Sequence, residues 1–213
     1  MLRQNSIRQQ KRRRSGVDAS SDAGFSLVEI MAASLVLATL AGLVVIIVGN
    51  LAGHYRLSGD ARGVSNSVAV AKLRAASLFT QTRLNVSLSS GTYKIQTWRK
   101  TGTPGWQDEG TVYTLSNGVG FGFSSVGTPP PNTQVSIAQA GACKDDAGAD
   151  ISGSACIVFN SRGLPVDSTG GPTGVGAFYL TDNNSVYAVT VSATGMMRFW
   201  RTVTSATPSW ALQ

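Results

Sequence analysis

The sequence predicts an α+β fold, in which a long N-terminal helix packs on antiparallel β-sheets. Three observations predict this fold. A long apolar run begins near residue 25, an apolar seam at helical spacing follows it, and short strand-like segments separated by turn residues begin at Asn85. Of the 213 residues 42% are hydrophobic, which is enough for a packed core beside the apolar run.

The first 24 residues form a basic arm. Six Lys or Arg residues and two Asp residues precede Gly24, so the arm carries +4 of the net charge of +7 and leaves +3 for the remainder. A basic run beside an apolar segment favours a cytoplasmic location for the arm by the positive-inside rule. Nucleic-acid binding is the alternative interpretation of such a run.

The segment 25–49 is expected to be a transmembrane helix. The 19 residues from Ile30 to Val48 contain no charge, and as a helix they would span ~28 Å, close to a bilayer core of ~30 Å. A cleavable secretory signal has a shorter apolar core and a small-residue cleavage site, which GNLAGHYR does not supply. A simple anchor fits the length but leaves Glu29 unexplained, because an ionisable group in a membrane segment is costly.

Residues 50–84 are expected to continue the helix outside the membrane, as far as about Thr82. The residues of the predicted apolar seam are Val64, Val68, Ala71, Ala75 and Leu78. Their spacing of three and four places them on one helical face. Glycines at 53, 59 and 63 predict a bend or local melting near 49–63.

Residues 85–213 predict a β-rich globular domain. NVSLSSGTYKIQTW reads as two strands around a Ser-Ser-Gly turn, KTGTPGWQDEG as a loop, and TVYTL and VGFGF as strands. VSIAQAGAC and CIVFNSRGLPV are expected to be apolar strands flanking a cysteine loop. GAFYLTDN and SVYAVTVSATGMMRFWR are expected to form the last hairpin, followed by the loose tail ATPSWALQ.

Two cysteines, Cys143 and Cys156, lie 13 positions apart in this domain. Outside the cytoplasm they are expected to form a disulfide, which would stabilise the short loop by ~2–3 kcal/mol. Two free buried thiols are the alternative. A zinc site is not supported because the single histidine, His54, is distant in sequence, and the acidic residues near the cysteines do not have the spacing of an EF-hand. We expect no metal, no cofactor and no catalytic constellation.

The stretch GFSLVEI at residues 24–30 resembles the processing junction of type IV prepilins and type II secretion pseudopilins. The resemblance implies a pilin fold and cleavage between Gly24 and Phe25 by a prepilin peptidase, so that residues 1–24 are a leader. It further implies N-methylation of Phe25 and places Glu29 at the fifth mature position, where the family uses it in filament assembly. The leader is longer than in many pilins.

Two distal motifs narrow the resemblance to the GspH/FimT group of minor pseudopilins and minor pilins. CIVFNSRGLPV is similar to the group's strand element through Phe159 and Gly163, and VYAVTVSATGMMRFWR to its closing strand pair with a turn at Gly195. The resemblance implies a structural, non-enzymatic subunit that initiates or caps a type II secretion pseudopilus or a type IV pilus. Its implied partners are other pilin subunits, the prepilin peptidase, the assembly platform and the bacterial inner membrane, with the C-terminal domain in the periplasm.

A second hypothesis is that the chain is a DNA-binding minor pilin for DNA uptake. Arg198 and Arg201 flank Phe199 and Trp200, and arginines among aromatic side chains can hold phosphates and stack on bases. Some members of the group bind DNA through a basic stretch after the glycine. Here Met196 and Met197 occupy those positions, which weakens the hypothesis.

Overall fold

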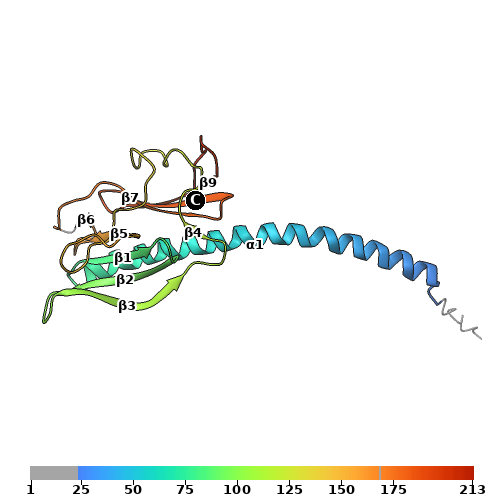
Figure 1. Ribbon diagram of the computed structural model, residues 1–213, viewed down its shortest axis with the longest axis horizontal. Coiled ribbons are helices and arrows are strands. Elements are labelled where there is room, and N and C mark those ends of the chain that lie inside the picture. Colours follow the sequence, from blue (N-terminus) through green and yellow to red (C-terminus); the bar gives the residue numbers. More distant parts are fainter. Residues whose placement is uncertain (1–23, 168) are drawn as a thin grey trace, which may run out of the picture. The chain divides into compact units, whose positions relative to one another are not determined.

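The computed structural model describes residues 24–167 and 169–213, and within its helix the side chains of residues 43–52 are outside the description. The expected leader therefore lies outside the described residues except for Gly24. The chain forms two compact units that divide between Val45 and Ile46. Helix α1 (Leu27–Ser77, 51 residues) contributes to both (Figure 1).

In the first unit, α1 begins immediately after Ser26, whose carbonyl accepts the N–H groups of Glu29 and Ile30 at 2.9 and 3.1 Å. No helix in the described part of the chain has the length and apolarity needed to cross a membrane. Of the expected span 25–49, the side chains of residues 43–49 lie outside the description.

The helix ends five residues before the predicted Thr82. Phe79 adopts a left-handed conformation with φ of 51°, and the N–H of Thr80 donates to the carbonyl of Ala75 at 3.3 Å. This is the pattern of a Schellman-type C-cap, which stops a helix and redirects the chain. Thr82 instead opens strand β1 (Thr82–Ser87).

The first sheet contains five antiparallel strands in the order β3-β2-β1-β5-β6. Besides β1 they are β2 (Thr92–Arg99), β3 (Gly105–Thr114), β5 (Ser154–Phe159) and β6 (Pro165–Val166). The hairpin around Ser-Ser-Gly is confirmed. The predicted loop KTGTPGWQDEG was wrong in its second half, because β3 starts at Gly105 and pairs with β2 along its length.

The second sheet has the order β10-β9-β8-β7-β4, also antiparallel. Its strands are β4 (Gly120–Phe121), β7 (Gly176–Thr181), β8 (Ser185–Val191), β9 (Met197–Val203) and β10 (Ala211–Leu212). The predicted last hairpin is confirmed as strands and extends to three of them: GAFYLTDN forms β7, which pairs with β8, and SVYAVTVSATGMMRFWR forms the pair β8 and β9. VSIAQAGAC does not form the predicted strand, and the end of the predicted loose tail pairs with β9 as β10.

The main core lies between the second half of α1 and the two sheets (Figure 1). Four members of the predicted seam, Val64, Val68, Ala71 and Ala75, are fully buried, together with Leu57. The seam belongs to one hydrophobic cluster with apolar residues from both sheets, among them Leu84, Val86, Ile157, Phe159, Phe178, Leu180 and Val189. Leu78 is 49% exposed because the helix ends at Ser77, so its inclusion in the seam was wrong.

The central strands of the second sheet, β7 and β8, are buried on both faces. Ala177, Tyr179, Val186, Ala188 and Trp200 face away from the main core and form a smaller cluster with Val126. The phenol of Tyr179 is fully buried and donates to Gln134 Oε1 at 2.7 Å. Burial raises the pKa of Tyr179, so the phenol remains a neutral donor at physiological pH. This arrangement explains why every residue of β8 is buried.

Two glycine turns meet at the side of α1. Gly163 and Gly195 have φ values of 72° and 76°, and the amine of Lys72 donates to the carbonyl of Gly195 at 2.8 Å. A Cβ at Gly195 would overlap the carbonyl oxygen of Gly163, and a Cβ at Gly163 would lie 2.9 Å from Lys72 Cε. Both glycines of the distal motifs are thus favoured by their left-handed backbone conformation, and Gly195 is also required by the close approach of the Gly163 carbonyl.

Candidate functional site

The expected processing junction lies just outside the helix. Gly24, Phe25 and Ser26 are non-helical, and both Gly24 and Phe25 are exposed, Phe25 by 78%. Glu29 occupies the first turn of α1, where a carboxylate interacts favourably with the positive end of the helix dipole. The bond between Gly24 and Phe25 is therefore in non-helical, accessible backbone one turn before the carboxylate.

The described part of the first unit, residues 24–42, has no packed core of its own. Every described side chain from residue 24 to residue 42 is exposed, and the large apolar ones expose between 54% at Leu40 and 78% at Phe25. An apolar surface of this extent is found where a protein contacts a membrane or another protein chain.

The two cysteines form a disulfide. The Cα atoms of Cys143 and Cys156 are 4.9 Å apart, and their sulfur atoms are bonded. Cys156 lies in β5, whereas Cys143 lies in the irregular segment that was expected to be a strand, so the bond joins a loop to a sheet and not two strands of a hairpin. Cys156 N–H also donates to the carbonyl of Gly141 at 2.8 Å, next to the bond.

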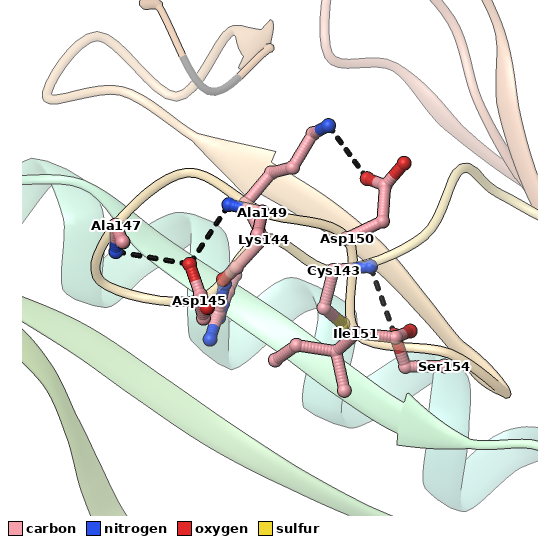
Figure 2. A network of polar contacts seen from close by, with 9 residues as sticks. Cys143, Lys144, Asp145, Ala147, Ala149, Asp150, Ile151 and Ser154 are labelled. Atoms are coloured by element: carbon pink, nitrogen blue, oxygen red, sulfur yellow. Dashed lines mark hydrogen bonds and ion pairs between the residues drawn. The ribbon is translucent and has the colours of Figure 1, made fainter.

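The loop between the cysteines is ordered by local polar contacts (Figure 2). Asp145 Oδ1 accepts the N–H groups of Ala147 and Ala149 at 2.9 and 2.8 Å, and Lys144 Nζ lies 2.6 Å from Asp150 Oδ1. Within the ranges that the structure describes, no group of three or more His, Cys, Asp or Glu side chains is arranged to hold a metal ion. The Asp145 carboxylate acts as a turn cap in this loop.

Sequence reasoning missed the side chains that hold this loop on the first sheet. Arg83 of β1 donates through Nη1 to the carbonyl of Lys144, and Asp146 Oδ1 accepts the N–H of Trp106 at 2.8 Å. The Arg83 Cζ atom lies 3.9 Å from the centroid of the Trp106 ring. The contact between Arg83 and Lys144 joins residues 61 positions apart, and no local pattern in TRLNVS indicates that its arginine is buried.

The two arginines of the DNA-binding hypothesis do not lie together. Three positions separate Arg198 from Arg201 in β9, so their side chains point to opposite faces of the strand. Arg201 lies over the Tyr187 ring with its Cζ atom 5.9 Å from the centroid, on the side of the main core. Arg198 is exposed and shares its face with the buried Trp200.

The fold thus belongs to the α+β class with a long N-terminal helix and antiparallel sheets. No protein-family model and no curated protein sequence matches the chain. Solved structures that are similar to it include two of the minor pseudopilin EpsH from the type II secretion system of Vibrio cholerae. The first has a TM-score of 0.41 and 10% identity over 68% of this chain and 94% of that chain. The second has a TM-score of 0.43 and 12% identity, and the match covers 73% of this chain and 96% of the EpsH chain.

Proposed function

We propose that the chain is a minor pilin or pseudopilin, a structural subunit of a type II secretion pseudopilus or a type IV pilus, and not an enzyme. Cleavage between Gly24 and Phe25 removes the leader, Phe25 is N-methylated, and the helix 25–49 anchors the subunit in the inner membrane until it joins the filament. The subunit initiates or caps assembly, with its β-rich domain in the periplasm.

The observation that carries this proposal is the junction GFSLVEI followed by 18 further residues without a charge. Two structural features support it. The backbone at Gly24 and Phe25 is exposed and non-helical, as a peptidase requires of its substrate. The apolar side chains of the following helix are exposed, so lipid or neighbouring helices have to cover them.

Glu29 has a specific role in this proposal. Cleavage creates a charged amine on Phe25, and in a staggered bundle of helices the amine of one subunit meets Glu29 of another. An ammonium–carboxylate pair in a medium of low dielectric constant is strongly favoured over either charge alone. Glu29 is therefore costly in the isolated subunit and satisfied in the filament, which fixes the axial register between subunits.

Mass spectrometry of the chain isolated from cells with an active prepilin peptidase tests the processing step. The expected product begins at Phe25 and carries one additional methyl group at its N-terminus. A chain that retains residues 1–24 in such cells would contradict the proposal, and a Gly24→Val variant should remain uncleaved.

Replacement of Glu29 tests the assembly step. Glu29→Ala should remain in the membrane fraction but be incorporated into filaments much less than the unmodified chain, because the ammonium of a neighbour loses its partner. Ser34→Ala is the matched control, since the Ser34 hydroxyl donates to Met31 O within its own helix. Equal incorporation of the two variants would refute the role of Glu29.

The orientation of Arg198 and Arg201 on opposite faces of β9 gives no specific support to DNA binding, so the structural role is the function proposed.

A further inference from the structure

The outer face of the first sheet carries a cleft of about 820 Å³, within the range of small-ligand sites. The strand register places Arg83, Gln96, Trp98, Trp106 and Asp108 on this face, because Arg83 is opposite Gln96, Gln96 is opposite Asp108, and Trp98 is opposite Trp106. The other face of the same strands holds the apolar residues of the main core. The residues that line the cleft all belong to the second unit.

Arg83 is an unusual residue for the floor of a cleft. It is 2% exposed, and its two hydrogen-bond acceptors are both neutral, namely Gln96 Oε1 at 2.8 Å and the carbonyl of Lys144. Among the described residues no carboxylate lies within ion-pair distance of its guanidinium. A buried arginine is normally paired with an anion, because removing an uncompensated charge from water is costly.

The two carboxylates whose charges act on the pKa of Arg83, Asp146 and Asp108, have other hydrogen-bond partners. Asp108 accepts from Lys94 Nζ at 2.8 Å and from Gln96 Nε2 at 2.7 Å, and Asp146 accepts from the N–H of Trp106. Burial lowers the pKa of Arg83 to about 10, and Asp146 and then Asp108 act in the opposite direction. Arg83 therefore stays charged at physiological pH without a direct counterion.

The guanidinium of Arg83 retains free donors. It has five N–H groups, of which Nε–H and one on Nη1 are used within the protein. Among the described residues, every fully buried polar side-chain atom has a hydrogen-bond partner. Arg83 Nη2 has no partner within that part of the chain, so it is not fully buried and reaches solvent. Since Arg83 lines the cleft, Nη2 is the donor left to give a charge-assisted hydrogen bond to a carboxylate bound there.

The walls beside Arg83 are aromatic. Trp98 and Trp106 are both half-buried, and their rings contact edge to face with centroids 5.3 Å apart. Lys100 also lines this end of the cleft, with its amine bound to the carbonyl of Phe79 at 2.7 Å. A flat apolar group attached to the carboxylate would contact these rings.

We infer that this cleft is a binding site for a carboxylate that carries an adjacent aromatic or apolar group, such as the C-terminus or an acidic side chain of a polypeptide, with Arg83 as the residue that binds the carboxylate.

Hippurate, which joins a carboxylate to an aromatic amide, is a suitable probe, and its neutral analogue hippuramide is the matched comparison. Binding to the purified full-length chain in a neutral detergent is followed by tryptophan fluorescence. Hippurate should cause a saturable change, and hippuramide should bind at least about tenfold more weakly, because it lacks the charge-assisted hydrogen bonds. Equal affinities, or no saturable change at the solubility limit of hippurate, would overturn the inference.

Variants assign the effect to Arg83. Arg83→Gln should weaken hippurate binding at least about tenfold and leave hippuramide binding unchanged. Arg99→Gln is the control, since Arg99 is an exposed residue of β2 that does not line the cleft. An equal loss in both variants would overturn the inference. If Arg83→Gln does not fold, the comparison of hippurate with hippuramide on the unmodified chain decides.

Two peptides distinguish the sources of the carboxylate. N-acetyl-phenylalanyl-alanine presents a terminal carboxylate, and N-acetyl-aspartyl-phenylalaninamide presents a side-chain carboxylate. Binding of either one, weakened by Arg83→Gln, supports the inference, and the tighter of the two identifies the source. Binding of neither peptide would overturn it for polypeptide ligands.

Discussion

At the scale of the residue, the contact between Gly163 and Gly195 gives a physical reason for glycine at these two positions. In the sequence, each glycine is only part of a separate motif. Both have a left-handed conformation. A Cβ at Gly195 would overlap the carbonyl oxygen of Gly163, whereas a Cβ at Gly163 would meet the flexible side chain of Lys72. The amine of Lys72 on α1 binds the same point through the carbonyl of Gly195. The two glycine turns thus hold the hairpin of β8 and β9 against α1.

Gly195→Ala should destabilise the β-rich unit by about 2–4 kcal/mol, because alanine pays both the conformational cost and the overlap with Gly163. Gly118→Ala is the matched control. Gly118 has φ of 85° and nothing within 4 Å of a new Cβ, so only the conformational cost of about 1–2 kcal/mol remains. Urea unfolding followed by tryptophan fluorescence measures both values. Equal losses would show that the close approach contributes nothing.

Asp108 predicts a pH dependence of stability. Hydrogen bonds from Lys94 and then Gln96 lower the pKa of Asp108, so above its ordinary pKa of about 3.9 the folded state gains stability. This contribution is lost as the pH falls through the lowered value, because the unfolded chain then binds more protons. The Asp108 side chain is 53% exposed and solvent screens the pair, so the contribution is about 0.5 kcal/mol.

Asp108→Asn should therefore lower the free energy of unfolding slightly at pH 7 and not at all near pH 2. The measurement is urea unfolding of both proteins across this range. A difference that grows as the pH falls would contradict the assignment.

At the scale of the element, the sequence predicted the buried face of α1 well, because helical periodicity is a local property. Val64, Val68, Ala71 and Ala75 were placed correctly. The end of the helix was not predicted, because the signal that stops it is the left-handed Phe79, where glycine is the usual residue. The start of β3 was not predicted either. Gly105 and Gly110 lie in KTGTPGWQDEG, and glycine ordinarily indicates a turn or loop, although here both glycines lie within the strand.

Val68 and Val70 provide a matched pair on α1. Val68 is fully buried and Val70 is 41% exposed. Val68→Ala should cost about 1–3 kcal/mol because it removes buried methyl groups and leaves a cavity. Val70→Ala should change stability by less than about 0.5 kcal/mol, since alanine is the better helix former. Thermal unfolding measures the difference, and equal effects would contradict the assigned seam.

The disulfide between Cys143 and Cys156 stabilises the loop that leads into β5, because it closes this loop covalently. Replacing both Cys143 and Cys156 with serine should lower the free energy of unfolding by about 2–3 kcal/mol, mainly by releasing the unfolded chain from a short closed loop. In this loop, Asp146 contacts Trp106 and Lys144 contacts Arg83. The tryptophan fluorescence of the folded protein should therefore also change. An unchanged denaturation midpoint would refute this stabilisation.

At the scale of the whole molecule, the α+β class followed from the order of the periodic patterns. The proposed cleft did not follow, because it depends on the register of distant segments. Arg83 meets Trp106 of β3 and Lys144 of the disulfide loop only after β1 has paired with β2 and β5. In the sequence, Arg83 is one cation among 18 Lys and Arg residues, and nothing local distinguishes it.

The division of the chain into two units predicts that the second one folds alone. Every buried hydrophobic residue of the described structure is at Leu57 or beyond, so a fragment of residues 46–213 retains the whole core. Its denaturation midpoint, followed by tryptophan fluorescence in the same detergent, should equal that of the full chain. A fragment of residues 60–213 lacks the fully buried Leu57 and should be less stable by about 2–3 kcal/mol. If the fragment 46–213 shows no cooperative transition, the apolar helix before it stabilises the globular unit, and the two units are not independent.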